Sequence, residues 1–118
     1  MYNHKFGKRG EQRAKQYLES KGYVTVAENY RFKNAEIDLI AKKGGLLVFI
    51  EVKTRNSSDY GFPEEAVNNN KVIKIKEAAD QFQIENNWKG LIRFDIIAII
   101  WPDQQLIPEI EHFEDAFY

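Results

Sequence analysis

Two apolar segments that carry acidic residues, separated by a Gly-Gly pair, constrain the fold of this 118-residue chain most strongly. The first segment covers residues 36–40 (EIDLI) and the second covers residues 46–53 (LLVFIEVK). Gly44-Gly45 is typical of a two-residue hairpin turn, because glycine readily adopts the positive φ that such turns need. The sequence therefore predicts two antiparallel strands joined by a tight turn.

The predicted turn also determines which side chains of the two strands lie opposite each other. With the glycines in the turn, Asp38 lies opposite Glu51 and Glu36 lies opposite Lys53. Directly opposed Cβ atoms are about 4.5–5.5 Å apart, so two carboxylates in these positions repel each other. Such a pair needs a nearby cation, which could be Lys53 or a metal ion, or a shared proton after a rise in pKa.

Strand alternation predicts that the charged and apolar side chains lie on opposite faces. We expect Ile37 and Leu39 to share one face, turned away from Glu36 and Asp38. An ordinary amphipathic sheet with one solvated face is the alternative interpretation. However, residues 46–50 are apolar throughout, which indicates a strand buried on both faces whose charges emerge near its end, where strands often line a cleft.

Size and composition narrow the class of protein. We expect residues 1–118 to form a single domain with one core. No apolar stretch approaches the ~20 residues that span a bilayer, and the basic N-terminus leads into a polar helix, so we expect a cytoplasmic protein without membrane contact. The chain has no cysteine and only 2 histidines. Any bound metal would therefore be a hard ion held by carboxylates.

The charge is distributed unevenly, although the formal net charge is only −1. Residues 1–59 contain 12 Lys or Arg against 7 Asp or Glu, and residues 60–118 contain 5 against 11. The basic surplus lies in the half that holds the acidic strands. This favours contact with a phosphate backbone, with ordinary solvated helix faces as the alternative.

Hydrophobic periodicity predicts the remaining elements. A helix is expected over about 5–21 with Gly22 as its stop, followed by a strand over 23–30. After a loop, Pro63 and two glutamates have the composition of a second helix start, and this helix is expected to end near 86–87.

The second helix is expected to bury an apolar face that includes Ile73 and Phe82. Residues 91–101 are predicted to form a central strand, and 107–113 a short edge strand because of Pro108. The predicted order is α-β-β-β-α-β(-β). The expected fold is α/β, a mixed central sheet of four to five strands flanked by two helices.

Several short segments resemble one protein family. Asp38, followed by residues 51–53 (EVK) on the next strand, resembles the PD-(D/E)XK signature of the restriction-endonuclease-like superfamily, and the order of elements is similar to that superfamily's core. Further segments closely resemble the YraN family of small bacterial proteins over about residues 7–100. These are 7–11 (GKRGE), 29–31 (NYR), 36–40 (EIDLI), 49–55 (FIEVKTR), 61–63 (GFP) and 93–95 (RFD). Ala35 departs from the family pattern, which usually has glycine there.

The resemblance implies a nuclease that hydrolyses phosphodiester bonds in DNA, including branched or nicked substrates. Asp38 and Glu51 would hold Mg²⁺ or Mn²⁺, and Lys53 would orient the attacking water or stabilise developing charge. Glu11 matches the acid that such nucleases bring from the first helix, and it would complete the metal shell or bind a second ion. Four basic residues are expected to contact nucleic acid: Lys8, Arg9, Arg55 and Lys71.

Two alternatives to a nuclease remain open at this point. The first is a nucleic-acid-binding module that keeps the carboxylates without efficient turnover. The second is a two-carboxylate hydrolase such as a glycosidase, which Lys53 beside the acids disfavours. A branched DNA substrate would favour a homodimer. Arg93 and Asp95 are expected to form a structural ion pair, and His112 is expected to have no special role.

Overall fold

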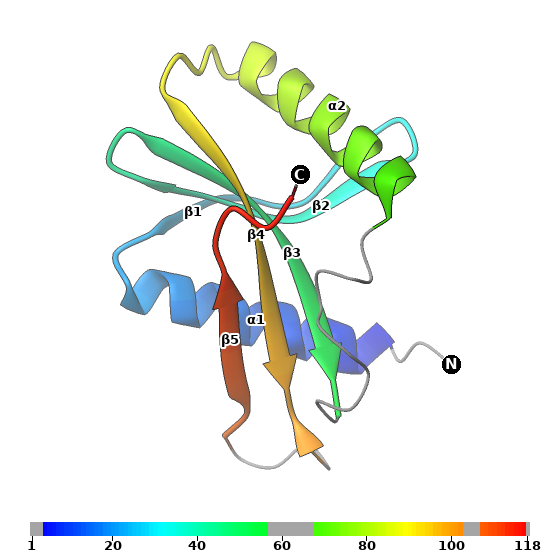
Figure 1. The fold of residues 1–118 in the computed structure, drawn as a ribbon. Coiled ribbons are helices and arrows are strands. Elements are labelled where there is room, and N and C mark those ends of the chain that lie inside the picture. The colour runs from blue at the N-terminus through cyan, green and yellow to red at the C-terminus, as the bar shows by residue number, and fades with distance from the viewer. Residues whose placement is uncertain (1–3, 57–67, 103–106, 118) are drawn as a thin grey trace.

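The structure, a computed structural model, describes residues 4–56, 68–102 and 107–117. Five strands form one mixed sheet in the order β1-β2-β3-β4-β5, and a helix packs on each face (Figure 1). This confirms the predicted α/β fold and the predicted order of elements. The elements are α1 (His4–Ser20), β1 (Val24–Phe32), β2 (Ala35–Lys43), β3 (Leu46–Arg55), α2 (Asn69–Glu85), β4 (Leu91–Ile100) and β5 (Glu109–Phe113).

Helix α1 ends at the predicted glycine. Gly22 has a φ of 91°, its N–H donates to the Glu19 carbonyl, and the Tyr23 N–H donates to the Leu18 carbonyl. These two bonds form a Schellman motif, which glycine favours because it has no Cβ to oppose positive φ. The motif turns the chain directly into β1. Leu18 and Tyr23 are then buried together in the core between α1 and the sheet.

The hairpin formed by β2 and β3 has the predicted register. Its paired residues run from Lys43 and Leu46 to Leu39 and Ile50, with Gly44 in the turn at a φ of 59°. The pairing between described residues ends there, one step before the expected contact between the two acids. The prediction that Asp38 and Glu36 directly oppose residues of β3 is therefore wrong, because β2 separates from β3 beyond Leu39.

The expected alternation along β2 is also wrong. Ile37 is buried in the core under α2, whereas Leu39 is buried in the core under α1. The cause lies in the neighbouring strand, where Asn29 has a φ of 51° at the position opposite Asp38, between the pairs that join Glu28 to Leu39 and Tyr30 to Ile37. Because Asn29 adopts a left-handed backbone conformation, the alternation along the paired strand β2 is broken. The side chains of Ile37 and Leu39 therefore turn to opposite faces of the sheet.

Helix α2 connects β3 to the parallel strand β4 and covers the other face of the sheet. It begins at Asn69, after Asn68, whose side chain accepts a hydrogen bond from the Lys71 N–H at 2.9 Å. Residues 63–65, where a helix start was predicted, lie outside the described residues, as does most of the predicted loop. The predicted apolar face is confirmed at Phe82, which is buried, but it was wrong at Ile73, which is 56% exposed while Ile75 is buried in its place.

The third strand of the sheet, β3, is its centre, and β4 lies between β3 and β5. The expectation that residues 91–101 form a central strand is confirmed in that β4 is an interior strand, one position from the middle of the sheet. Strand β5 lies at the edge, as Pro108 predicted. Neither of the two described helices is long and apolar enough to cross a membrane.

Candidate functional site

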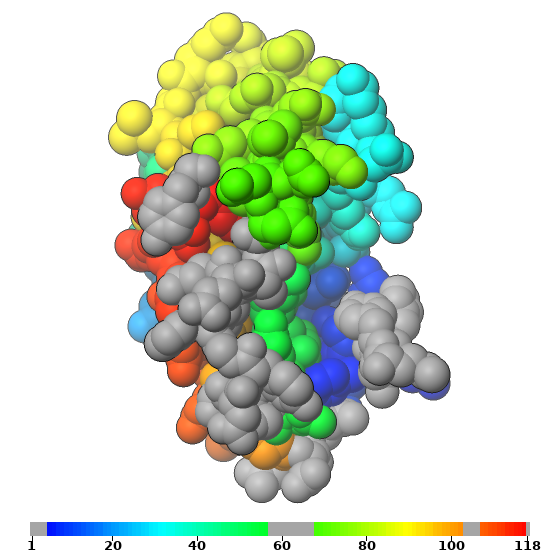
Figure 2. Space-filling view, turned by 45° about the vertical axis from the view of Figure 1, so that its right-hand side comes forward, coloured from blue at the N-terminus to red at the C-terminus, as the bar shows by residue number. Residues whose placement is uncertain are grey.

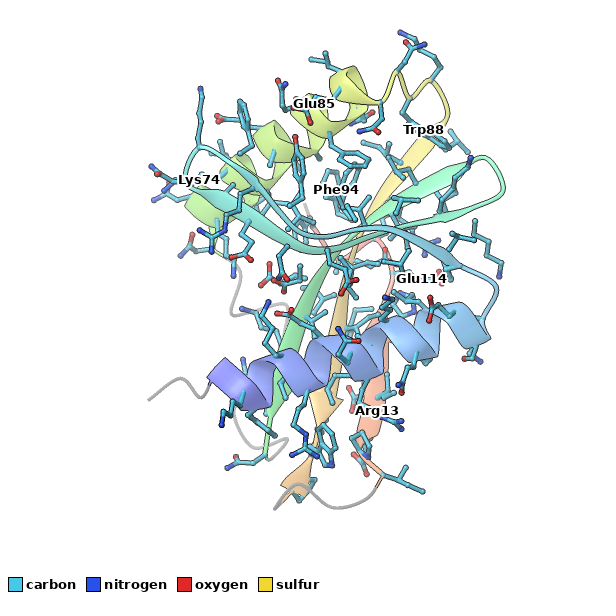
Figure 3. The ribbon with its side chains drawn as sticks, turned by 180° about the vertical axis from the view of Figure 1, so that it is seen from behind. Arg13, Lys74, Glu85, Trp88, Phe94 and Glu114 are labelled. Atoms are coloured by element: carbon cyan, nitrogen blue, oxygen red, sulfur yellow. The ribbon has the colours of Figure 1, made fainter. Side chains whose placement is uncertain are left out.

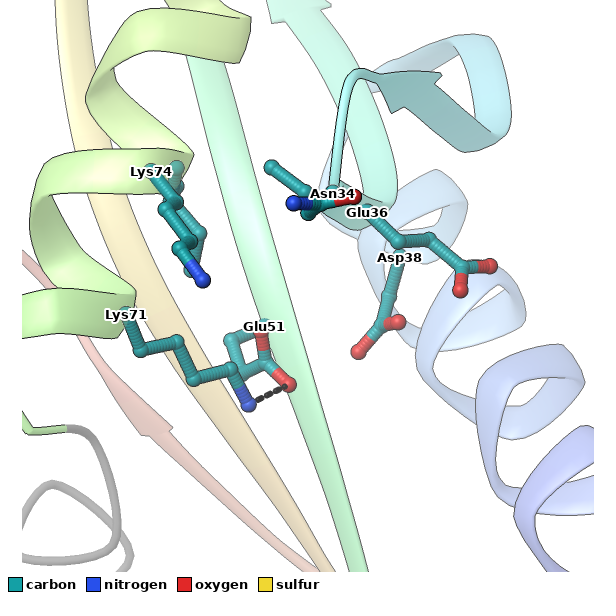
Figure 4. A pocket seen from close by; sticks show the side chains of 8 residues that line it. Asn34, Glu36, Asp38, Glu51, Lys71 and Lys74 are labelled. Atoms are coloured by element: carbon teal, nitrogen blue, oxygen red, sulfur yellow. Dashed lines mark hydrogen bonds and ion pairs between the residues drawn. The ribbon is translucent and has the colours of Figure 1, made fainter.

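A cleft of about 250 Å³ opens between the end of the β2–β3 pairing and the first turns of α2. Figure 2 shows these turns next to the β1–β2 turn, above the end of β3. Acidic side chains from two strands and lysines from α2 face one another across the cleft (Figure 4). The cleft is lined by Asn34, Ala35, Glu36, Asp38, Glu51, Lys71, Lys74 and Ile75.

Glu51 lies at the centre of the cleft and is only 7% exposed. Strand β3 places it on the same face as Phe49, so it points toward α2. Its Oε1 accepts a hydrogen bond from Lys71 Nζ at 3.0 Å, and Lys53 Nζ lies 3.5 Å from the same oxygen. The predicted phosphate contact Lys71 is therefore part of the carboxylate site, because it lies in the first turn of α2.

Asp38 reaches the same cleft from β2. Its Oδ2 accepts a hydrogen bond at 2.8 Å from the backbone N–H of Val52, the residue that follows Glu51. Burial, together with the negative charge of Glu51, raises the pKa of Asp38 to about 8. A buried carboxylate beside a second one favours a proton or a cation, so the site attracts positive charge.

The two lysines respond differently to this environment. Burial lowers the pKa of Lys53, and the attraction of Glu51 only partly opposes this effect. Burial also lowers the pKa of Lys71, but the charge of Glu51 and the hydrogen bond to it outweigh burial and raise this pKa. Lys71 is therefore the main counterion of Glu51. The amine of Lys53 interacts with Glu51 more weakly.

Glu11, the third predicted metal ligand, is next to the cleft and does not line it. Its Oε1 accepts hydrogen bonds from Lys8 at 3.3 Å and from Asn29 Nδ2 at 3.2 Å. Its negative charge contributes to the raised pKa of Asp38, after the larger effects of burial and Glu51. Across residues 4–56, 68–102 and 107–117, no three acidic or histidine side chains are arranged to hold a metal ion.

The remaining predicted residues lie around this centre. Glu36 lines the cleft but forms an ion pair with Arg31 at 3.5 Å instead of Lys53. Arg55 ends β3, two steps beyond Lys53 on the same strand face. Arg9 lies on α1 with its guanidinium 4.6 Å from the centre of the Trp101 ring.

Sequence reasoning missed two residues of the site, Lys74 and Asn29. Lys74 is visible in the sequence only as one of several lysines in a helix, and its place at the cleft follows from how α2 docks (Figure 3). Asn29 is bound to Lys8 and Glu11, and asparagine is the residue that most readily takes positive φ after glycine. A polar residue inside a predicted strand was the available signal.

On the α1 face of the sheet, the expected ion pair of Arg93 and Asp95 is confirmed. Arg93 Nε and Nη2 donate to the two Asp95 oxygens at 2.8 Å each. The expectation that His112 is ordinary was wrong, because its Nε2 lies 2.7 Å from Asp95 Oδ2 and its Nδ1 lies 3.2 Å from the Tyr17 hydroxyl. This network joins β4, β5 and α1, away from the cleft.

The fold and the site define an α/β protein with a five-stranded mixed sheet and a carboxylate–lysine cleft beside its central strand. The model of the uncharacterised protein family UPF0102 matches residues 10–99, and the chain belongs to that family. This confirms the resemblance to the YraN family, which is the same family.

Several relatives match most of the chain. The UPF0102 protein of Flavobacterium psychrophilum is 44% identical over 112 residues, which are 95% of this chain and 92% of the relative. That of Cytophaga hutchinsonii is 48% identical over 90 residues, which are 76% of this chain and 80% of the relative. That of Dictyoglomus thermophilum is 40% identical over 118 residues, which are 99% and 100% of the two chains.

Proposed function

We propose that this protein is a metal-dependent nuclease that hydrolyses phosphodiester bonds in DNA. The observation that carries the proposal is the meeting of Asp38 and Glu51 in one cleft with Lys53 and Lys71. The spacing of Asp38, Glu51 and Lys53 is similar to the PD-(D/E)XK signature of restriction-endonuclease-like enzymes. The α-β-β-β-α-β-β order supports the same superfamily.

The donor set of the cleft fits a hard divalent cation. Asp38 and Glu51 supply carboxylate oxygens, which Mg²⁺ and Mn²⁺ prefer as ligands. Their proximity raises the pKa of Asp38 after the larger effect of burial, so a cation between them would relieve an existing repulsion. Glu11 lies next to the cleft on α1 without lining it, so it would add negative charge to the metal site. When bound, the ion would polarise the phosphate and lower the pKa of a bound water.

The side chains of the cleft would bind and orient the substrate. Lys53 lies on the same strand face as Glu51, where its amine can hold the attacking water or a phosphate oxygen. Lys71 and Lys74 line the cleft from α2, so they would pair with phosphates on either side of the scissile bond. Lys8, Arg9 and Arg55 would extend the phosphate contacts along the DNA strand.

A DNA-binding module without turnover is the second candidate function. It is favoured by one observation, the pairing of both Lys71 and Lys53 with the same oxygen of Glu51. These lysines neutralise a charge that a metal ion would otherwise neutralise. In this case the cleft would bind phosphate and would not hydrolyse it.

The experiment that separates the two functions is cleavage of linear, nicked, flapped and four-way DNA in Mg²⁺, Mn²⁺ or EDTA. Asp38→Asn and Lys53→Ala are compared with the wild type and with Asp80→Asn, an exposed position on α2. A nuclease requires cleavage that depends on the metal, on Asp38 and on Lys53, and is unchanged in Asp80→Asn. Cleavage that both site variants retain would contradict the mechanism, and DNA binding without cleavage would support the binding module.

The same panel addresses the form of the substrate. We propose branched or nicked DNA, because the basic residues extend from α1 past the cleft to the end of β3. A homodimer would present two clefts to a symmetric junction. Size-exclusion chromatography with and without four-way DNA tests this arrangement, and a monomer bound to the junction would contradict it.

A further inference from the structure

A second hollow of about 310 Å³ lies beside the start of α1, away from the carboxylates. Four of its five lining residues come from α1 as two adjacent pairs, and the pairs lie four positions apart, so they form one face of the helix. The fifth is Trp101, which directly follows β4. The hollow is lined by Lys8, Arg9, Gln12, Arg13 and Trp101.

Trp101 forms a fixed apolar floor in this hollow. Its side chain belongs to the core under α1, the residue is only 4% exposed, and the Phe6 ring lies 6.3 Å away. Its backbone N–H donates to the Arg55 carbonyl at 2.7 Å, which fixes the residue beside the end of β3. The exposed Arg9 guanidinium lies over the ring at 4.6 Å from its centre.

The rim of the hollow is strongly basic. Lys8, Arg9 and Arg13 contribute three positive charges, and none of the lining residues is acidic. Arg13, labelled in Figure 3, donates from Nη1 to Gln16, while its Nε is buried without a hydrogen-bond partner among the described residues. Three basic side chains beside an apolar floor match a ligand that combines an aromatic ring with an anion.

Lys8 connects the hollow to the carboxylate cleft. Its Nζ donates to Asn29 Oδ1 at 2.7 Å and lies 3.3 Å from Glu11. Asn29 follows Glu28 and precedes Tyr30, whose partners on β2, Leu39 and Ile37, flank Asp38. A DNA strand that contacts Lys8 would therefore reach the hollow on one side of this lysine and the approach to Asp38 on the other side.

We propose that this hollow binds one unpaired nucleotide of the DNA strand that enters the cleft. The base stacks on the exposed Arg9 guanidinium, which itself lies over the buried Trp101 ring, and Lys8 and Arg13 bind its phosphate. The volume is at the lower end of the range for ligand pockets, about 300–1,000 Å³, which suits a single nucleotide. Bases inside a duplex are already stacked, so the hollow selects single-stranded, flapped or frayed DNA. This inference rests on the proposed action on DNA.

The test uses the intrinsic fluorescence of Trp101. The chain has two tryptophans, and Trp88 lies at the opposite end of β4, where its Nε1 donates to the Leu91 carbonyl. Trp88→Phe therefore leaves Trp101 as the only reporter. This protein is titrated in EDTA with a single-stranded oligonucleotide, and separately with an abasic oligomer of equal length and charge.

We expect the normal oligonucleotide to change Trp101 fluorescence and to bind roughly ten-fold or more tightly than the abasic oligomer at equal ionic strength, because base stacking is absent from the latter. Equal affinities, with no change in fluorescence, would overturn the inference and would leave only a contact to the backbone. Cleavage of duplex DNA in Mg²⁺ tests the proposed function separately, since it requires no unpaired base.

A matched pair of helix variants tests the rim without altering the buried tryptophan. Arg13→Gln should weaken binding of the normal oligonucleotide by roughly ten-fold and remove its advantage over intact duplex. Lys15→Gln removes the same charge from the same helix, at a residue that pairs with Glu28 at 3.1 Å and does not line the hollow. Equal losses in the two variants would overturn the proposed site.

Discussion

Asp38 Oδ2 accepts the Val52 backbone N–H at 2.8 Å, at the point where the pairing of β2 with β3 ends. The carboxylate takes the place of a main-chain acceptor from the departing strand, so it holds the strands together where they diverge. The same bond brings Asp38 beside Glu51, the neighbour of Val52. The local geometry of the hairpin therefore creates the close pair of acids, even though the two residues are not directly opposed.

The first prediction concerns the pH dependence of stability. Because burial and the charge of Glu51 raise the pKa of Asp38 to about 8, the folded protein holds a proton that the unfolded chain has lost above about pH 4. The folded state then binds more protons than the unfolded state, so stability falls as pH rises from about 4 to about 8.

Urea unfolding in EDTA at pH 5, 6.5 and 8 measures this effect. The wild type should lose about 1 kcal/mol or more of unfolding free energy between pH 5 and pH 8 relative to Asp38→Asn, which has no proton to release. Asp80→Asn on the exposed face of α2 is the control and should keep the wild-type slope. Parallel curves for Asp38→Asn and the wild type would show that Asp38 ionises normally.

The second prediction concerns the metal ion. Mg²⁺ or Mn²⁺ should raise the Tm at pH 8, because an ion bound by the folded state alone stabilises it by about 2.7 kcal/mol at one hundred times its Kd. Asp38→Asn and Glu51→Gln should abolish the increase, and Glu11→Gln should reduce it. Glu85→Gln, at the exposed end of α2, should retain it. Identical metal-induced shifts in Asp38→Asn and the wild type would exclude binding at this cleft.

How much of this arrangement could be predicted depends on the range of the interactions. The hairpin register follows from Gly44 and Gly45 and is local, so the sequence predicted it from Lys43 to Leu39. The reversal of faces at Asp38 depends on the left-handed Asn29 in the partner strand. No periodicity within β2 contains that information, which is why the expected opposition of the acids was wrong.

The parts of the site that come from α2 show the same limit. Lys71 was predicted as a phosphate contact, and its bond to Glu51 depends on how the crossover helix docks on the sheet. The choice between Ile73 and Ile75 for the buried face also depends on that docking, since the lysine-rich start of the helix has no clear apolar stripe. Trp101 gave no signal because its neighbours on α1 are almost the whole chain length away in sequence.

The third prediction concerns the close contact of α1 with β3. A Cβ added at Gly10 would overlap the side chain of Thr54, which is the residue after Lys53 on β3. Gly10→Ala improves helix propensity by about 1 kcal/mol, but the overlap displaces the helix at a cost of typically 1–3 kcal/mol. We expect a net loss of stability in urea unfolding. Gln16→Ala, at an exposed position of the same helix, should be neutral or stabilising, and an equal response of the two variants would contradict the contact.

The fourth prediction concerns the polar network on the α1 face. Asp95 is fully buried and accepts hydrogen bonds from Arg93 and from the Asp115 N–H, with His112 2.7 Å away. Burial raises its pKa, but the hydrogen bonds with His112, Arg93 and the Asp115 N–H, together with the charge of Arg93, outweigh burial and lower the pKa below its ordinary value. The folded state therefore binds fewer protons than the unfolded state, and this stabilisation is lost as the pH falls below about 4.

Asp95→Asn leaves the Arg93 guanidinium without its carboxylate, and breaking such a pair costs about 3–5 kcal/mol. Urea unfolding at pH 7 should show this loss, and the variant should also lose the wild-type decrease in stability below pH 4. Because Asp95 lies with Ile97 on the α1 side of β4, whereas Glu51 faces α2, metal-dependent stabilisation should persist at a temperature where the variant is folded. If the folded Asp95→Asn protein were no longer stabilised by the metal ion, this result would contradict the prediction and show that the two faces of the sheet are coupled.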